Sequence, residues 1–366
     1  MSISPMAEAL RPLASRMPQV VREREVLRVA ATLGGANVVQ AVEAARREVL
    51  TWALRRSGGV LPAEALQHQS FEHLAGGRNC TGVRISSAEM DLWAIRADDP
   101  DKYVARRSWT TEVTIGHMKG QRARFSIRLL VSSPEQNLEI EPAIPGLVNQ
   151  IVSRCGLERN GIELRNDHFI IKSNDDAETL IDLLVAPTRD LPVFVLTVPE
   201  LAADPHMPLV DPGSLTRATV GLAHVVVIPA QFTWALTDRF GKKLSVFGGA
   251  VRVYLPGFTE DTDPYGGHQL VLRDRLATAT ATAGCAKWLR QLAASESVKR
   301  LRLGADVLSF AAIRSTSLDL QRDRLENEGA DDTKQLDAAR AQIAALKEEL
   351  KKVYPDSLGS RKSLRL

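Results

Sequence analysis

The chain has 366 residues, of which 44% are hydrophobic and 25% charged, and its formal net charge is +3 at pH 7. These proportions are typical of a soluble globular protein with two or three domains, and so small a charge permits a nucleic-acid partner without demanding one. The three cysteines, Cys80, Cys155 and Cys285, are odd in number and far apart, which argues against a disulfide framework or a cysteine-based zinc site.

Two further features of the sequence concern location. Residues 1–16 lack the apolar segment of a signal peptide. No stretch approaches the roughly 18 consecutive apolar residues that a membrane span needs. With the scattered cysteines, these features predict a cytoplasmic protein with no membrane partner.

The first part of the chain has the spacing of helices. Between Ala7 and Arg56, apolar residues recur at helical intervals at Val42, Ala45, Val49 and Trp52. Gly34-Gly35 is expected to separate two helices, and a further short helix is expected at Pro62–Leu74. We predict a helical N-terminal region at 1–75, an antiparallel β region at 76–140, an α/β domain at 141–275 and a helical tail at 276–366.

The period changes to two between Cys80 and Ser132. Apolar and polar residues alternate over Trp109–Ile115, and the alternation resumes over Ala123–Leu129 after a polar turn. This pattern predicts an antiparallel hairpin with one apolar and one polar face.

Three arginines of the second strand, Arg122, Arg124 and Arg128, have the parity opposite to Phe125 and therefore are expected on its solvent-facing side. Same-side neighbours on a strand are about 6–7 Å apart, close to the spacing of successive phosphates, so we consider a nucleic-acid-binding stripe. The alternative is an ordinary solvated face, or pairing of the arginines with Glu112 and other acids across the strands.

The third region predicts a small parallel sheet. Short apolar runs rich in β-branched residues, Val193–Leu196 and Val225–Ile228, suit strands that are covered on both faces. Segments of helical length separate them, so the order is βαβαβ. The expected strands of this unit are Pro192–Val198, His224–Ile228 and Leu244–Tyr254, and its expected helices are Leu215–Leu222 and Phe232–Phe240. Before this unit, the sequence predicts a helix at Gly146–Cys155 and short strands at Ile162–Leu164 and Phe169–Ile171. A second helix, capped by Ser173 or Asn174, is expected to follow these strands.

Ligands of open α/β sheets bind beyond the carboxyl ends of the strands, where the richest candidate is the loop Glu260–His268. Its side chains Asp261, Asp263 and His268, with Glu260, could hold Mg²⁺ or Mn²⁺, and Arg252 and Tyr254 could contact a phosphate or pair with these acids. The alternatives are a plain surface turn, which this composition also suits, or contact with a partner. Asp211 is interpreted as a helix cap and His224 as a hydrogen-bonded histidine at the core edge.

The tail carries a short heptad pattern that predicts a coiled coil or, alternatively, a helix docked on its own domain. Its seam positions are Leu336, Ala339, Ile343, Leu346, Leu350 and Val353. Two and a half heptads are visible, fewer than the three or four that define a coiled coil. As a coiled coil, this helix would bind a partner protein or a second copy of the chain.

Four segments resemble uncharacterised bacterial proteins encoded beside anti-phage defence genes. They are Ser108–Glu112, Leu191–Val193, Gly249–Gly257 and the helical tail. The resemblance implies a bacterial defence context and attaches no catalytic residue to any of these segments.

Two hypotheses of function follow. The first is a non-catalytic or weakly catalytic component of a bacterial multi-protein system, which binds partner proteins through its helical ends and nucleic acid through its basic faces. The second is a metal-dependent nuclease or phosphohydrolase that uses the loop Glu260–His268 to orient a water against phosphate.

Overall fold

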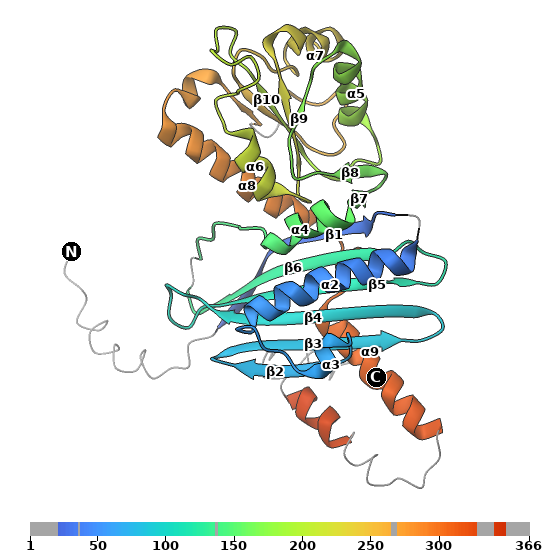
Figure 1. The fold of residues 1–366 in the computed structure, drawn as a ribbon. Coiled ribbons are helices and arrows are strands. Elements are labelled where there is room, and N and C mark those ends of the chain that lie inside the picture. The colour runs from blue at the N-terminus through green and yellow to red at the C-terminus, as the bar shows by residue number, and fades with distance from the viewer. Residues whose placement is uncertain (1–20, 36, 136–137, 265–268, 328–339, 349–366) are drawn as a thin grey trace, which may run out of the picture. The chain divides into compact units, whose positions relative to one another are not determined.

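A computed structural model describes residues 21–35, 37–135, 138–264, 269–327 and 340–348 (Figure 1). The chain divides into two compact units, Met1–Phe310 and Ala311–Leu366. The first unit contains two β-sheets with their helices. The second contains most of helix α9 (Phe310–Asn327) and a helical stretch at 340–348.

The larger sheet is antiparallel and has eight strands in the order β2-β3-β4-β5-β6-β1-β7-β8. The strands are β1 (Arg22–Leu33), β2 (Phe71–Ala75), β3 (Arg78–Ser86), β4 (Met90–Pro100), β5 (Ser108–Met118), β6 (Arg124–Ser133), β7 (Leu157–Arg159) and β8 (Ile162–Leu164). The predicted hairpin is present as β5 and β6, with Val113 opposite Ile127 in its buried face. Helix α2 (Val38–Arg56) lies across this sheet (Figure 1), and Val49 and Trp52 of the helix pack into the same core as Ile127.

Residues 22–33, expected within a helical region, form strand β1 instead. The strand runs antiparallel to β6, and Gly34-Gly35 joins it to α2 rather than separating two helices. Val26, Leu27, Val29, Ala30 and Ala31 are all buried. Helices α2 and α8 (Ala279–Arg300) both contact β1. A strand that is covered on both faces is apolar on both faces, so its sequence lacks the alternation of apolar and polar residues that would have identified it as a strand. The helix expected at Pro62–Leu74 is likewise a single turn, α3 (Ala63–Leu66), followed by β2.

The smaller sheet has five strands in the order β13-β12-β10-β11-β9. They are β9 (Phe169–Ile170), β10 (Val193–Thr197), β11 (His224–Ile228), β12 (Val251–Tyr254) and β13 (Leu270–Val271). Strands β9, β10 and β11 are parallel, but β12 runs antiparallel to β10. The predicted βαβαβ unit is therefore wrong in its third strand. The chain passes from α7 (Thr233–Phe240) through residues 241–250 to β12, which pairs with β10 in the reverse direction.

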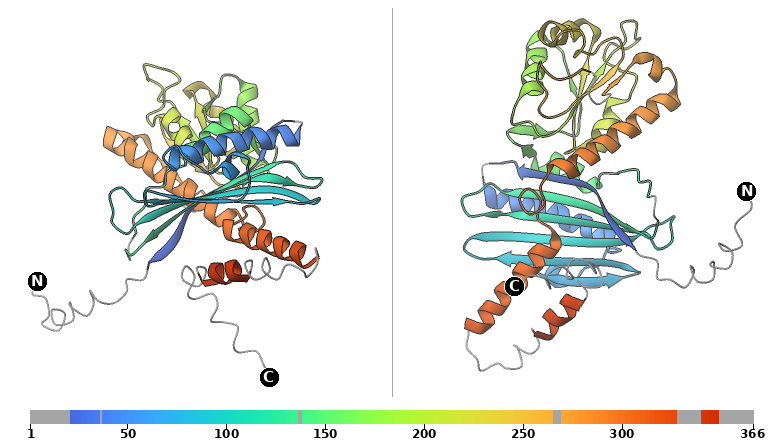
Figure 2. Two further views of the ribbon diagram at one scale, coloured as in Figure 1. Left: turned by 60° about the horizontal axis from the view of Figure 1, so that its bottom comes forward. Right: turned by 180° about the vertical axis from the view of Figure 1, so that it is seen from behind.

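Two pairs of helices cover the smaller sheet. Helix α5 (Asn174–Val185) and α7 pack with Val193, Val195 and Val226 on one face. Helix α6 (Pro212–Thr219) and α8 contact each other and belong to the core that holds Phe194 and Leu196 on the other face. Figure 2 shows α8 passing from the smaller sheet to the larger one, where the backbone N–H of Arg28 donates to Ser297 Oγ at 3.0 Å. The remaining elements are helix α4 (Gly146–Cys155) and two 3₁₀ turns, η1 (Ala230–Phe232) and η2 (Arg273–Leu276).

Candidate binding pocket beside strand β11

A pocket lies beside strand β11, where the edge strand β9 stops short. The register pairs Phe169 with Val226 and Ile170 with Val227, so His224 and Val225 extend past the end of β9. The space beside them has a volume of about 200 Å³. Its lining residues are Ile162, Glu163, Arg165, Asp167, Phe169, Thr179, Leu180, Leu183, Thr216, Ala223, His224, Val225 and Val226.

Local sequence chemistry places the helical wall of this pocket. Ser173 caps α5 by accepting a hydrogen bond from the backbone of Asp176 at 3.1 Å, and the Asp176 carboxylate accepts from the backbone N–H of Ser173 at 3.0 Å. This capping box begins the helix directly after β9. It thereby directs Thr179, Leu180 and Leu183 toward the space beside β11.

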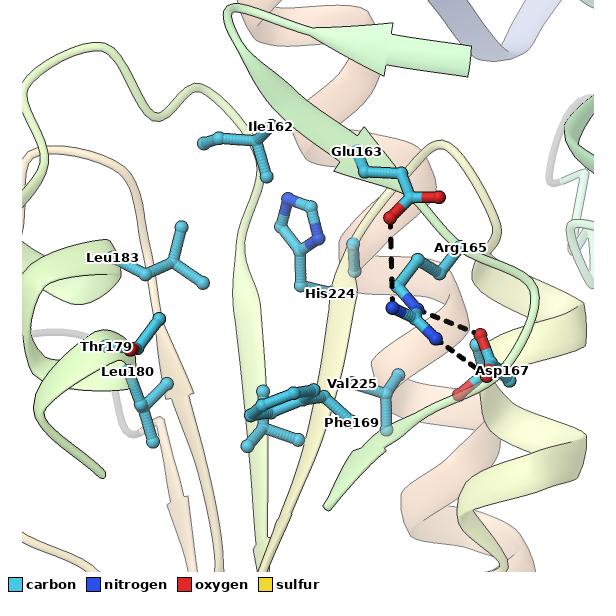
Figure 3. Close-up of a pocket in the computed structure, with 13 residues that line it drawn as sticks. Ile162, Glu163, Arg165, Asp167, Phe169, Thr179, Leu180, Leu183, His224 and Val225 are labelled. Carbon is cyan, nitrogen blue, oxygen red and sulfur yellow. Dashed lines mark hydrogen bonds and ion pairs between the residues drawn. The ribbon is translucent and has the colours of Figure 1, made fainter. Parts of the chain in front are cut away.

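One side of the pocket is apolar and the other is charged (Figure 3). The ring of Phe169 is 36% exposed and lies at one end, and Leu183 lies opposite the charged side. Arg165 donates two hydrogen bonds of 3.0 Å to the carboxylate of Asp167 and lies 3.7 Å from that of Glu163. The pairing with Arg165 lowers the pKa of Asp167, so that this carboxylate is ionised at neutral pH.

The imidazole of His224 points into the pocket between Leu183 and Arg165 (Figure 3). Its backbone N–H donates to the Pro192 carbonyl at 2.9 Å and holds the residue in the ladder with β10. Burial, together with the positive charge of Arg189, lowers the pKa of His224 to about 4. At pH 7 the ring is therefore neutral and offers one donor and one acceptor nitrogen.

Arg189 ties together the elements behind the pocket. Its side chain is 2% exposed and donates five hydrogen bonds of 2.7–3.0 Å to backbone carbonyls. The acceptors are Leu183, Leu184, Leu191, Tyr254 and Leu255. Burial lowers the pKa of Arg189 to about 10, which still leaves it charged at neutral pH. The guanidinium thus fixes the last turn of α5 against β10 and β12, and with it the position of Leu183.

The structure places Arg252 and Tyr254 in the core rather than facing a phosphate. Arg252 is 6% exposed and donates to the carbonyls of Lys243 and Ser245 at 2.8 and 3.1 Å. The Tyr254 hydroxyl donates to the Leu244 carbonyl at 2.8 Å. Both side chains leave the same face of β12, as predicted, but they close the 243–245 loop and do not pair with the acids of Glu260–His268.

The acidic loop does not form a metal site among the residues that the structure describes. Glu260 forms an ion pair with Arg239 of α7. Asp261 and Asp263 follow it in a turn, and His268 lies outside the described residues. No group of three or more potential metal ligands occurs in the described ranges.

The three arginines of the predicted stripe have three different environments. Arg122 is exposed and forms a two-pronged ion pair with Glu158 at 2.8 and 3.0 Å. Arg124 is exposed and donates to the Ala305 carbonyl at 3.4 Å. Arg128 is 7% exposed, so its prediction as a solvent-facing residue is wrong. It lies in the middle of the sheet between Glu25 and Glu112, and for this residue the alternative of cross-strand pairing is correct.

The seam of the predicted coiled coil is described only in part. Ile343 and Leu346 lie on the helical stretch 340–348, and both are partly buried. Leu336, Ala339, Leu350 and Val353 lie outside the described residues.

Sequence reasoning missed most of the residues that line the pocket. Glu163, Arg165, Asp167, Phe169 and Thr179 belong to segments that showed no recognisable motif. One signal was present in the composition: residues 162–185 carry six carboxylates against two cationic side chains, although the whole chain has a net charge of +3. A local reversal of charge of this kind marks a surface with its own electrostatic preference.

Comparisons with protein-family models, with curated proteins and with solved structures gave no match. Within the described part of the chain, every helix is too short or too polar to cross a membrane.

Proposed function

We propose that this chain is a non-catalytic component of a bacterial multi-protein system and that it binds a partner protein through the pocket beside β11. The observation that carries the proposal is the pocket itself, where apolar side chains line a cavity beside the part of β11 that extends past the end of β9. Apolar side chains of partner segments commonly bind in such pockets. The resemblance of four segments to proteins encoded beside anti-phage defence genes supports a defence context.

The size of the pocket favours a side chain over a free small molecule. Sites for drug-sized ligands enclose about 300–1,000 Å³. The pocket beside β11 encloses about 200 Å³, which suits one large side chain of a partner. Phe169, an aromatic ring left 36% exposed at its end, provides the kind of apolar contact that anchors such side chains.

Site-specific photo-crosslinking tests this proposal. A benzophenone amino acid replaces Phe169 in a chain expressed together with its genomic neighbours, and the matched control carries the same group at Tyr103, which is 93% exposed in the loop between β4 and β5. We expect a discrete cross-linked protein for position 169 and not for position 103. Identical products at both positions, or none at position 169, would contradict partner binding at this pocket.

Two further surfaces of the chain offer contacts to partners, the helical tail and the exposed arginines Arg122 and Arg124. The heptad positions around Ile343 and Leu346 support association with a partner or a second copy through the tail. Arg122 and Arg124 remain at the surface and support at most a weak nucleic-acid contact, because Arg122 is already paired with Glu158.

A further inference from the structure

We infer that the partner segment for this pocket is a short linear peptide with one large apolar side chain flanked by lysine or arginine. The inference rests on the proposed function and adds the chemistry of the partner. Two properties of the pocket carry it, the apolar lining around His224 and the acidic surroundings of the opening.

The interior of the pocket excludes a charged anchor. Ile162, Leu180 and Leu183 present hydrocarbon, and His224 is neutral at pH 7. The Arg189 guanidinium lies near enough to His224 to influence its charge, so a second cation inserted there would be repelled. An anionic anchor would have to leave water for a lining that is mostly apolar, and burial of a charge in such surroundings is strongly unfavourable. The residue that enters is therefore apolar.

The surroundings of the opening favour basic flanks. The exposed carboxylates of Glu163 and Asp167 border the pocket on one side. On α5, Asp175 and Asp182 are exposed and lie four residues before and three residues after Thr179, so they flank it on the same side of the helix. Only Arg165 and Lys172 oppose the six carboxylates of residues 162–185. Cations beside the anchor would meet this negative field.

Fluorescence anisotropy with labelled nine-residue peptides tests the inference. The probe has phenylalanine at its centre, two lysines on each side and glycine or serine elsewhere. One comparison peptide replaces phenylalanine with serine, and a second replaces the four lysines with glutamates. We expect the lysine-flanked phenylalanine peptide to bind at least tenfold more tightly than either comparison peptide.

A matched pair of substitutions links the binding to the pocket. Thr179 and Thr51 are both exposed threonines in helices. The hydroxyl of each donates a hydrogen bond of 2.8 Å to the backbone carbonyl four residues earlier. They differ in that Thr179 lines the pocket and Thr51 does not. Thr179→Trp should fill the pocket and abolish peptide binding, whereas Thr51→Trp should leave it unchanged. Asp175→Asn with Asp182→Asn should weaken binding by up to about fivefold per charge.

The outcomes separate this inference from the proposed function. Equal binding of the lysine- and glutamate-flanked peptides, or binding that survives Thr179→Trp, would overturn the inference. If position 169 still cross-linked to a discrete partner in that case, partner binding would stand with a different chemistry. If the cross-link were also missing, both would fall.

Discussion

Glu112 and Arg128 face each other directly across strands β5 and β6, and Arg128 Nη1 donates to Glu112 Oε2 at 2.8 Å. The same guanidinium also donates to both carboxylate oxygens of Glu25 on β1 at 3.0 and 3.1 Å. These bonds join three neighbouring strands of the larger sheet through one buried cation. Arg128 therefore has a structural role, and the bonds to the two glutamates keep its pKa above the ordinary value.

Removal of this cation should destabilise the fold strongly. Arg128→Met removes the shortest ion pair of the buried Glu112, whereas the partly buried Glu25 keeps its pair with Arg28, and breaking a buried ion pair in this way costs about 3–5 kcal/mol. The exposed pair of Arg122 with Glu158 is the matched control, and Arg122→Met should cost less than about 1 kcal/mol. The measurement is the midpoint of urea unfolding followed by circular dichroism. Similar midpoints for the two variants would show that Arg128 is not a structural cation.

Substitution of Arg189 should loosen the smaller sheet and the pocket together. Arg189→Met removes a guanidinium that serves five backbone carbonyls. Each buried acceptor left without a donor costs about 1–3 kcal/mol, and some of the five will be rescued by water. We expect a loss of at least about 3 kcal/mol in unfolding free energy and faster hydrogen exchange in β10 and α5. Unchanged exchange in these two elements would contradict the role assigned to Arg189.

His224 should make stability depend on pH. Its pKa is lowered to about 4 in the folded chain from the ordinary 6.5, so between these values the unfolded chain binds a proton that the folded chain does not. Stability should therefore fall as pH decreases from 6.5 to 4, by at most about 1.4 kcal/mol per pH unit. His224→Gln should flatten this part of the profile.

The control for the pH profile is the exposed His206, in the loop after β10. His206→Gln should leave the slope between pH 4 and 6.5 as in the unsubstituted chain. The measurement is urea unfolding at half-unit steps of pH. A slope that persists in the His224→Gln variant would assign the pH dependence to other groups.

Nucleic-acid binding through Arg122 and Arg124 should be weak, because two exposed arginines allow few phosphate contacts. Each phosphate contact contributes roughly −0.9 to the slope of log affinity against log salt on duplex DNA. Because Arg128 is buried, the Arg122→Ala, Arg124→Ala double variant should flatten the slope by no more than about two units. Fluorescence anisotropy with duplex DNA at several salt concentrations measures it. No binding at low salt would remove nucleic acid from the proposed function.

The tail should mediate association. A chain that ends at Gly329 lacks all six heptad positions between Leu336 and Val353, and it should be monomeric. The full chain should show a larger mass if the heptads pair with a second copy. Size-exclusion chromatography with light scattering compares the two. Equal monomeric masses would count against self-association through the tail.

The sequence alone determined the elements whose signals are local. Helix α4 and strand β11 have the predicted bounds, and Ser173 and Asp211 cap α5 and α6 as their side-chain chemistry predicts. Caps and helical or strand periods depend on residues two to four positions apart, so they can be read along the chain. The β5–β6 hairpin belongs to the same group, because its turn and alternation are contiguous.

Tertiary structure decided the rest. Residues 22–33 form β1 because they pair with β6 and β7, which lie far away in the sequence, and β12 likewise pairs with a distant strand, β10, to which it is antiparallel. Arg128 was predicted to face solvent because its parity is opposite to that of Phe125. In the assembled sheet it forms ion pairs with Glu25 of β1 and Glu112 of β5. The pocket joins residues between Ile162 and Val226 that no local pattern connects. Burial and strand direction depend on contacts between distant segments, and such contacts exist only once the sheets are assembled.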